Sequence, residues 1–224
     1  MKGPEFGPHD GSPPLSATGS SPMLTLPDAE TQVVLCQHGT TGVPPGTLSR
    51  AAILPGAFNP VHDGHRQLRE AAACFLGQPV CFELSLENVD KPPLERCDVQ
   101  RRLATMAEIP VFLTRAPHFT QKARLFPRSW FVVGFDTAER LLDLRYYNNE
   151  VRRRHAALSQ LLSGGIRFLV AGRLTGPGDR STFSVRSQLQ VPNGFEYLFT
   201  ELPEERFRVD MWSSEIRNRR GDNG

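Results

Sequence analysis

The stretch LPGAFNPVHDGH, residues 54–65, decides how this chain is expected to fold. It starts at the end of a short apolar run, residues 51–55, and passes through glycines and prolines into a segment with helical spacing of apolar residues. A strand, a tight corner and a helix in this order form the first half of a βαβ unit. The corner therefore predicts where the folded domain starts and how its first two elements are joined.

From this corner onward, short apolar runs alternate with longer segments of helical periodicity. The predicted strands are 51–55, 80–86, 111–115, 130–135 and 166–171, which would form the sheet, and a later one at 195–199. The predicted helices are 64–76, 95–108, 120–125, 137–142 and 151–162. Such alternation is typical of βαβ units. We therefore expect an α/β domain with a Rossmann-like parallel sheet and helices on both faces.

The flanking sequence divides the chain into further parts. Residues 1–22 contain four Gly, five Pro and four Ser, a composition that buries too little apolar surface to offset the entropy of ordering the chain. They are predicted to be a disordered tail. Residues 23–49, with one apolar run at 33–36, are predicted to be an irregular extension or a stray edge strand. The folded domain is expected over 50–220, followed by a short tail at 221–224.

Charge and cysteine usage restrict the class of protein. The formal net charge of +2 does not favour a nucleic-acid or membrane partner, and the basic run 152–155 has no stacking aromatic residues beside it. The four cysteines have no C-x-x-C spacing, no secretory signal is present, and no apolar run reaches the roughly 18 residues of a membrane span. We therefore expect a soluble, cytoplasmic protein with small-molecule partners and no metal held by the chain itself.

Each residue type in the corner has a use in binding phosphate. Gly56 removes a side chain where the backbone leaves the sheet, so that main-chain amides can approach an anion. His65 falls in the first turn of the predicted helix, where free amides and the helix dipole favour negative charge. His62 precedes it by three residues. The pair predicts a triphosphate site, with metal ligation or an exposed polar turn as the alternatives.

Two segments resemble signatures of the nucleotidylyltransferase superfamily, which includes nicotinamide and nicotinate mononucleotide adenylyltransferases and cytidylyltransferases. GAFNPVHDGH, residues 56–65, resembles its G-x-F-x-P-x-H-x-G-H motif, and WSSEIR, residues 212–217, is similar to its S-S-T-x-I-R motif except at Glu215. The resemblance implies the nucleotidylyltransferase fold, and it implies His62 and His65 as the catalytic, triphosphate-binding residues. The nucleotide-binding residues that it implies are Gly56, Ala57, Phe58, Ser213, Ser214 and Arg217. A simple helix cap is the alternative for the two serines.

A third segment, VGFDT at residues 133–137, is similar to the family's V-G-x-D-T corner after the fourth strand. The resemblance implies that Gly134 and Asp136 lie near the nucleotide base and ribose. A plain helix N-cap is the alternative for Asp136.

The loop NVDKPPLERCDVQRR, residues 88–102, resembles the family's substrate-side loop. Lys91 is expected at the acceptor phosphate or at the triphosphate. Arg96, Arg101 and Arg102 lie on a predicted helix, where arginines are more often solvated or salt-bridged, and their role stays open.

Together these motifs predict an adenylyltransferase of NAD biosynthesis. The phosphate of a mononucleotide, in the first place nicotinamide mononucleotide, would attack the α-phosphorus of ATP and give NAD and pyrophosphate, with Mg²⁺ accompanying ATP as the resemblance implies. A cytidylyltransferase, a phosphopantetheine adenylyltransferase and a nucleotide-binding protein that has lost catalysis are the alternatives, the last because of Glu215 and the chain end at Gly224. The P-loop, protein-kinase and G-x-G-x-x-G motifs are absent, which disfavours kinases, ATPases and dehydrogenases.

Overall fold

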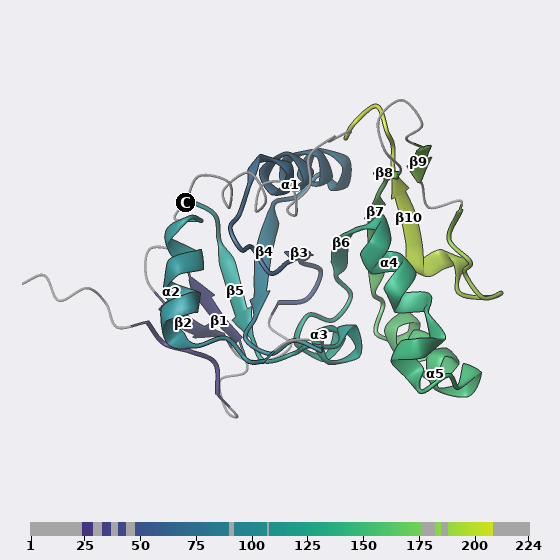
Figure 1. Cartoon of the computed structure of the whole chain (residues 1–224), viewed down its shortest axis with the longest axis horizontal. Helices are drawn as coiled ribbons and strands as arrows, with labels where there is room; N and C mark the ends of the chain where they lie inside the picture. The colour runs from purple at the N-terminus through teal and green to yellow at the C-terminus, as the bar shows by residue number, and fades with distance from the viewer. Residues whose placement is uncertain are drawn as a thin grey trace, which may run out of the picture.

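The computed structural model describes residues 24–28, 33–36, 40–43, 48–89, 92–106, 108–175, 182–184 and 188–207. An eight-stranded sheet forms its centre (Figure 1). Across the sheet the strands are β10 (Phe199–Leu202), β7 (Arg167–Ala171), β6 (Trp130–Gly134), β3 (Ala52–Pro55), β4 (Val80–Ser85), β5 (Val111–Thr114), β1 (Val33–Cys36) and β2 (Thr40–Val43). Outside it, β8 (Arg173–Thr175) and β9 (Thr182–Ser184) form a separate antiparallel pair.

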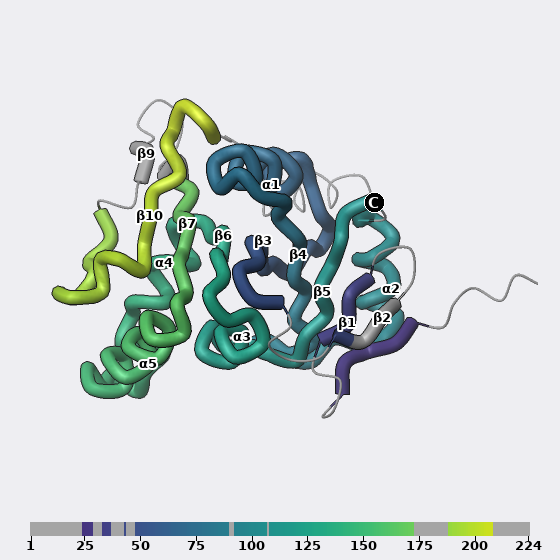
Figure 2. The backbone as a smooth tube through the Cα atoms, turned by 180° about the vertical axis from the view of Figure 1, so that it is seen from behind, coloured from purple at the N-terminus to yellow at the C-terminus, as the bar shows by residue number. Residues whose placement is uncertain are grey.

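The six strands from β10 to β5 are parallel, whereas β1 and β2 are antiparallel to their neighbours. The chain enters the parallel part at β3, adds β4 and β5 on one side, and then adds β6, β7 and β10 on the other. Figure 2 shows β10 toward one end of this arrangement and the antiparallel β1 toward the other. The predicted α/β class with a mostly parallel sheet is confirmed.

Two groups of helices cover the sheet. The helices are α1 (Asp63–Leu76), α2 (Arg96–Ala104), α3 (Phe119–Leu125), α4 (Phe135–Leu142) and α5 (Val151–Ser163), with short 3-10 helices η1 (Leu144–Tyr147) and η4 (Glu196–Leu198). Leu54 of β3 belongs to one core cluster with Leu68 of α1, and the adjacent Ile53 belongs to a second cluster with Leu158 of α5. Since successive strand residues point to opposite faces, the two clusters lie on the two faces of the sheet.

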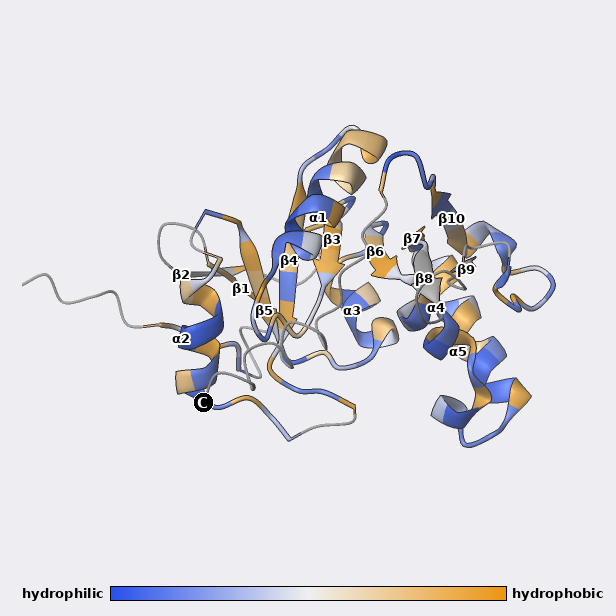
Figure 3. Cartoon of the chain, turned by 45° about the horizontal axis from the view of Figure 1, so that its top comes forward, coloured by the Kyte–Doolittle hydropathy of each residue, from blue (hydrophilic) through white to orange (hydrophobic). Residues whose placement is uncertain are grey.

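Hydrophobic residues are concentrated on the strands, while the helices alternate apolar and polar stripes (Figure 3). Strands that are covered on both faces read as continuous apolar runs, which is why their positions are predictable from sequence. α1 ends at Gly77, whose φ of 66° lies in the left-handed region that favours glycine. Among the residues described, none of the helices combines the length and the apolar character that a bilayer span needs.

The segment expected to be an irregular extension contributes two strands. β1 pairs with β5, and its Val33 and Val34 are both 0% exposed. Further upstream, Arg96 Nη1 donates to the Leu24 carbonyl at 2.6 Å and Arg115 Nε donates to the Pro27 carbonyl at 2.8 Å. These contacts make the described part of this segment a component of the domain.

The strand predicted at 195–199 starts later in the structure than the sequence indicated. Residues 196–198 form η4, and β10 begins at Phe199. The sequence FEYLF has the aromatic content of a strand, yet its Tyr197 is exposed while Leu198 is buried. The parallel pairing with β7, from Phe199 opposite Phe168 to Leu202 opposite Ala171, decides the register.

Candidate functional site

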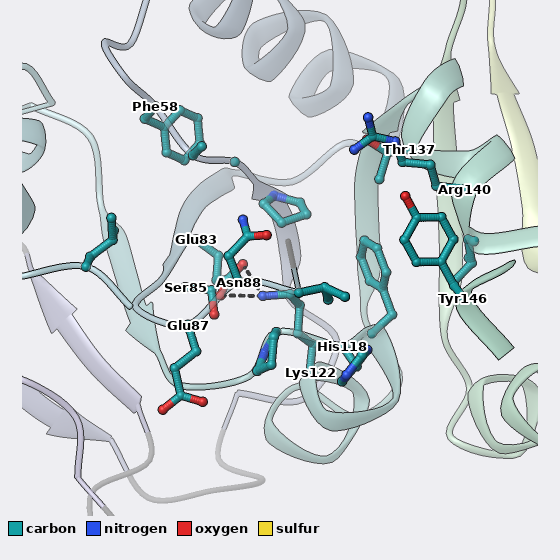
Figure 4. A pocket seen from close by; sticks show the side chains of 18 of the residues that line it. Phe58, Glu83, Ser85, Glu87, Asn88, His118, Lys122, Thr137, Arg140 and Tyr146 are labelled. Atoms are coloured by element: carbon teal, nitrogen blue, oxygen red, sulfur yellow. Dashed lines mark hydrogen bonds and ion pairs between the residues drawn. The ribbon is translucent and has the colours of Figure 1, made fainter. Parts of the chain in front are cut away.

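A cavity of about 450 Å³ lies beyond the carboxyl ends of three adjacent parallel strands. Its lining comes from β3 and β4, from the segments that follow β3, β4 and β5, and from residues of α1 to α5 and η1. Figure 4 shows Phe58 and Glu83 on one side of it and Arg140 and Tyr146 on the other. Of the residues predicted for the site, Gly56, Ala57, Phe58 and His65 line this cavity.

The corner after β3 is shaped by Gly56 and Phe58. The Gly56 amide donates to the Glu83 carbonyl at 3.0 Å and so extends the pairing of β3 with β4. A Cβ at Gly56 would lie 2.7 Å from the Phe58 ring, closer than side-chain carbons normally approach. Phe58 has a φ of 44°, rare for a residue with a side chain, and its ring, 1% exposed, packs on Phe82 at a centroid distance of 4.5 Å. The corner therefore requires glycine at position 56.

His62 and His65 come together at the start of α1. His62 is the N-cap residue, and its amide donates to Nδ1 of His65 at 3.3 Å. The two ring centroids are 3.7 Å apart. Only His65 lines the cavity, and its ring also meets the Phe58 ring edge-on at a centroid distance of 5.1 Å. Of the predicted pair, the His65 imidazole therefore lines the cavity. The imidazole of His62, the residue that precedes α1, lies against the His65 ring.

The surroundings of His65 keep its imidazole neutral. Burial lowers the pKa of His65 to about 4, and the adjacent His62 acts in the same direction. Burial also lowers the pKa of His62. Because Nδ1 of His65 accepts a hydrogen bond, the single proton of the neutral ring belongs on Nε2. His65 can therefore donate a hydrogen bond from Nε2.

A buried ion pair lies in the cavity wall. Lys122 Nζ of α3 contacts Glu83 Oε1 and Oε2 of β4 at 2.6 Å and 2.7 Å (Figure 4). Thr114 Oγ1 of β5 donates to Glu83 Oε1 at 2.6 Å. Glu83 is 1% exposed and Lys122 4%. Sequence reasoning missed both residues. The available signal was the single acid in the apolar run VCFELSL, since a buried carboxylate needs a cation and hydrogen-bond donors.

Arg102 of α2 also borders the cavity. Its Nη1 donates to the Ala57 carbonyl at 2.6 Å, and its Nε is buried with no hydrogen-bond partner. Burial lowers the pKa of Arg102. The neighbouring Arg101 is exposed and forms an ion pair with Asp98, as expected for a helix-surface arginine. Of the three arginines left open by the sequence, Arg102 is the one at the cavity, and Arg96 instead bonds the N-terminal segment.

The lining has an aromatic side and an excess of positive charge. Phe119, Tyr146 and Tyr147 contribute the aromatic side, and the Tyr147 hydroxyl donates to the Leu141 carbonyl at 2.8 Å. Two lining acids are neutralised, Glu83 by Lys122 and Glu87 by Arg115. In the part of the chain that the structure describes, no ion pair joins Arg102 or Arg140 to a carboxylate. The cavity is therefore suited to an anionic ligand with an aromatic or apolar part.

Other predicted site residues lie elsewhere. Gly134, exposed, is the N-cap residue of α4, and Asp136 lies in the first turn of that helix. Asp136 lines a second depression together with Glu139 and Asp143, and Arg140 lines both this depression and the cavity. Lys91, Ser213, Ser214 and Arg217 fall outside the residues that the structure describes.

The sequence was also compared with known proteins. No protein-family model matches it, and no curated protein matches it at a significant level. The motifs and the geometry of the cavity are therefore the features that indicate a function for this chain.

Proposed function

We propose that this protein transfers the adenylyl group of ATP to the phosphate of a mononucleotide, in the first place nicotinamide mononucleotide, giving NAD and releasing pyrophosphate. The observation that carries the proposal is the neutral His65, held by the His62 amide at the phosphate-binding corner and bordering the 450 Å³ cavity. A neutral imidazole donates to phosphate oxygens without acting as a strong acid.

The sheet supports this proposal. Counted along the parallel strands from β3, the order across the sheet is 3-2-1-4-5-6, which is the order of doubly wound nucleotide-binding folds. Ligands of such folds bind beyond the carboxyl ends of the strands, where the order reverses. Here the reversal lies at β3, and the corner from Gly56 to His65 follows that strand. The proposed fold is therefore Rossmann-like and of the nucleotidylyltransferase type.

In the proposed reaction an oxygen of the acceptor phosphate attacks the α-phosphorus of ATP. The new bond forms between these two atoms, and the bond from the α-phosphorus to the oxygen bridging to the β-phosphate breaks, so that the electron pair leaves with pyrophosphate. His65 Nε2–H donates to a phosphate oxygen and stabilises the developing charge. Gly56 lets the backbone approach the phosphates, and the dipole of α1, whose N-terminus follows the corner, favours their charge.

Mg²⁺ enters this scheme as part of the ATP substrate. Mg²⁺ usually keeps several waters and binds substrate phosphates with only one or two carboxylates, so it needs no dedicated protein cage. Within the described ranges no three His, Cys, Asp or Glu side chains gather as a metal site. The lining of the cavity is compatible with a metal ion held chiefly by the triphosphate.

The direct test follows pyrophosphate release from magnesium ATP with a panel of acceptors: nicotinamide and nicotinate mononucleotides, other nucleoside monophosphates and phosphopantetheine. CTP replaces ATP in a parallel series. We expect turnover with ATP and a mononucleotide, and at least a hundredfold loss in His65→Ala, on the order of one lost transition-state donor. His155→Ala, an exposed histidine on α5, is the matched control. Turnover that survives in His65→Ala, or ATP binding without any pyrophosphate release, would contradict the proposal.

A further inference from the structure

Arg102 is a buried cation that forms no ion pair with a carboxylate of the described residues, and the nearby Asp98, whose charge raises the pKa of Arg102, is itself paired with Arg101. It is 9% exposed, and the one hydrogen bond that the structure gives its side chain runs from Nη1 to a neutral acceptor, the Ala57 carbonyl. Its Nε is enclosed with no partner. Burying a guanidinium in this way costs free energy unless an anion compensates it. Because Nε is enclosed, the Nη donors that do not bond Ala57 are the ones left for an anion in the cavity that Arg102 lines.

The adjacent arginine shows that this environment is specific to one position of α2. Arg101 projects into solvent, and its partner Asp98 lies one turn earlier on the same helix. Arg102 instead faces the core side of α2, where Val99 is also buried. Two arginines that are adjacent in sequence thus differ in burial, in partner and in access to the cavity.

The position of Arg102 indicates which phosphate it can reach. Ala57, whose carbonyl it binds, lies inside the corner between Gly56 and Phe58. α2 connects β4 to β5, which lie on one side of β3 in the strand order, whereas β6 and the α4 that follows it lie on the other side of β3. Gly134 and Asp136, the residues expected near the nucleotide, belong to that other side. A ligand group beside Arg102 therefore meets the corner from the β4 side.

We propose that Arg102 binds the phosphate monoester of the acceptor and orients it toward the α-phosphorus of ATP. This inference rests on the proposed nucleotidyl transfer and assigns the acceptor's phosphate to a residue for which the sequence left the role open. A guanidinium has five N–H donors in one plane, and two of them can bind two phosphate oxygens together. One donor already bonds the Ala57 carbonyl, so Arg102 would link the bound acceptor phosphate to the main chain of the corner.

The inference is tested by pairing a ligand change with a residue change. Wild type, Arg102→Gln, Arg102→Lys and Arg101→Gln are titrated calorimetrically with nicotinamide mononucleotide, nicotinamide riboside and inorganic phosphate. We expect Arg102→Gln to weaken mononucleotide and phosphate binding roughly ten- to a hundredfold, the range of a lost charge-assisted hydrogen bond, and to leave riboside binding unchanged. Arg102→Lys should recover part of the affinity, and Arg101→Gln should behave as wild type.

Turnover adds a second readout. Arg102→Gln should raise KM for the mononucleotide far more than KM for ATP, whereas a general structural defect would affect both. Thermal unfolding of each variant separates loss of binding from loss of folding, and Arg102→Lys keeps the test valid if the glutamine variant does not fold. Equal losses for mononucleotide and riboside, or wild-type phosphate affinity in Arg102→Gln, would overturn the inference.

The two proposals fail in different ways. If wild type binds inorganic phosphate through Arg102 but releases no pyrophosphate with any acceptor, the anion site stands and nucleotidyl transfer is wrong. If wild type turns over and Arg102→Gln keeps the wild-type KM for its acceptor, nucleotidyl transfer stands and the role of Arg102 is wrong.

Discussion

The main-chain amide of His62 donates a hydrogen bond to Nδ1 of His65 across 3.3 Å, and the two rings lie with their centroids 3.7 Å apart. This contact occupies one nitrogen of His65 and leaves Nε2 as the proton-bearing atom. The residue at position 62 therefore acts on the cavity through its backbone, while the residue at position 65 acts through its ring.

The first prediction concerns which ring nitrogen of His65 donates the hydrogen bond to the phosphate. Glutamine carries its amide NH₂ near the position of Nε2, whereas the shorter asparagine reaches only the position of Nδ1. We therefore expect His65→Gln to keep more of the pyrophosphate-release activity than His65→Asn. Steady-state kinetics of both variants decides this, and the reverse ranking would assign the function to Nδ1.

The second prediction concerns pH. The pKa of His65 is about 4 in the folded chain and 6.5 in its unperturbed state. Between these values the unfolded chain binds more protons, so the free energy of unfolding should fall as pH decreases from about 6.5 to 4, by up to roughly 3 kcal/mol from this residue. Above pH 6.5 its contribution is constant. Urea unfolding of wild type and His65→Gln over this pH range measures the difference. If the free energies of unfolding of the two proteins had the same pH dependence, the His65 ring would protonate as readily in the folded state as in the unfolded chain.

The third prediction concerns the Glu83–Lys122 ion pair. Removing one partner leaves a buried charge, so Lys122→Met should lower the free energy of unfolding by about 3–5 kcal/mol. Glu83→Gln combined with Lys122→Met should cost less than the sum of the two single changes, as expected for residues in contact. Glu150→Gln, which breaks the exposed pair of Glu150 with Arg153 on α5, should cost no more than about 1 kcal/mol. Additive effects in the buried pair would mean that the two side chains act independently.

The fourth prediction concerns Gly56. Gly56→Ala places a methyl group 2.7 Å from the Phe58 ring, which is buried and cannot move freely. We expect a loss of about 1–3 kcal/mol in stability, typical of overpacking, together with reduced activity. Gly134→Ala is the stability control, because a Cβ there has nothing within 4 Å. Combining Gly56→Ala with Phe58→Leu should restore part of the stability if the ring is the obstacle.

The fifth prediction concerns the strand before the parallel sheet. Val34 of β1 is fully buried against β5, so Val34→Ala should lower the free energy of unfolding by about 1–3 kcal/mol. Val151→Ala, at a half-exposed position on α5, should change it by less than about 0.5 kcal/mol. Chemical denaturation compares the two. A Val34 variant as stable as wild type would mean that β1 contributes little to the domain.

Local signals predicted much of the fold. The corner from Leu54 to His65 was recognisable because its residue types follow from local geometry, such as the close approach of the Phe58 ring to Gly56. The central strands were recognisable because burial on both faces makes them continuously apolar. β1 and β2 were harder to predict, since a four-residue run such as 33–36 becomes a strand only when the edge of β5 offers it hydrogen-bond partners.

For the candidate site, the sequence by itself determined the corner after β3, with His65 on the first turn of α1 and Gly56 where the chain leaves β3. Only the tertiary structure decided which polar residues meet there. Glu83, Thr114 and Lys122 come from three elements, and their contacts span up to 39 positions of sequence. The sequence left the roles of Arg101 and Arg102 open, and the packing of α2 turns one to solvent and the other to the cavity. The physical reason is that periodicity reports the face on which a residue lies, whereas burial and charge pairing depend on elements that the chain brings together from a distance.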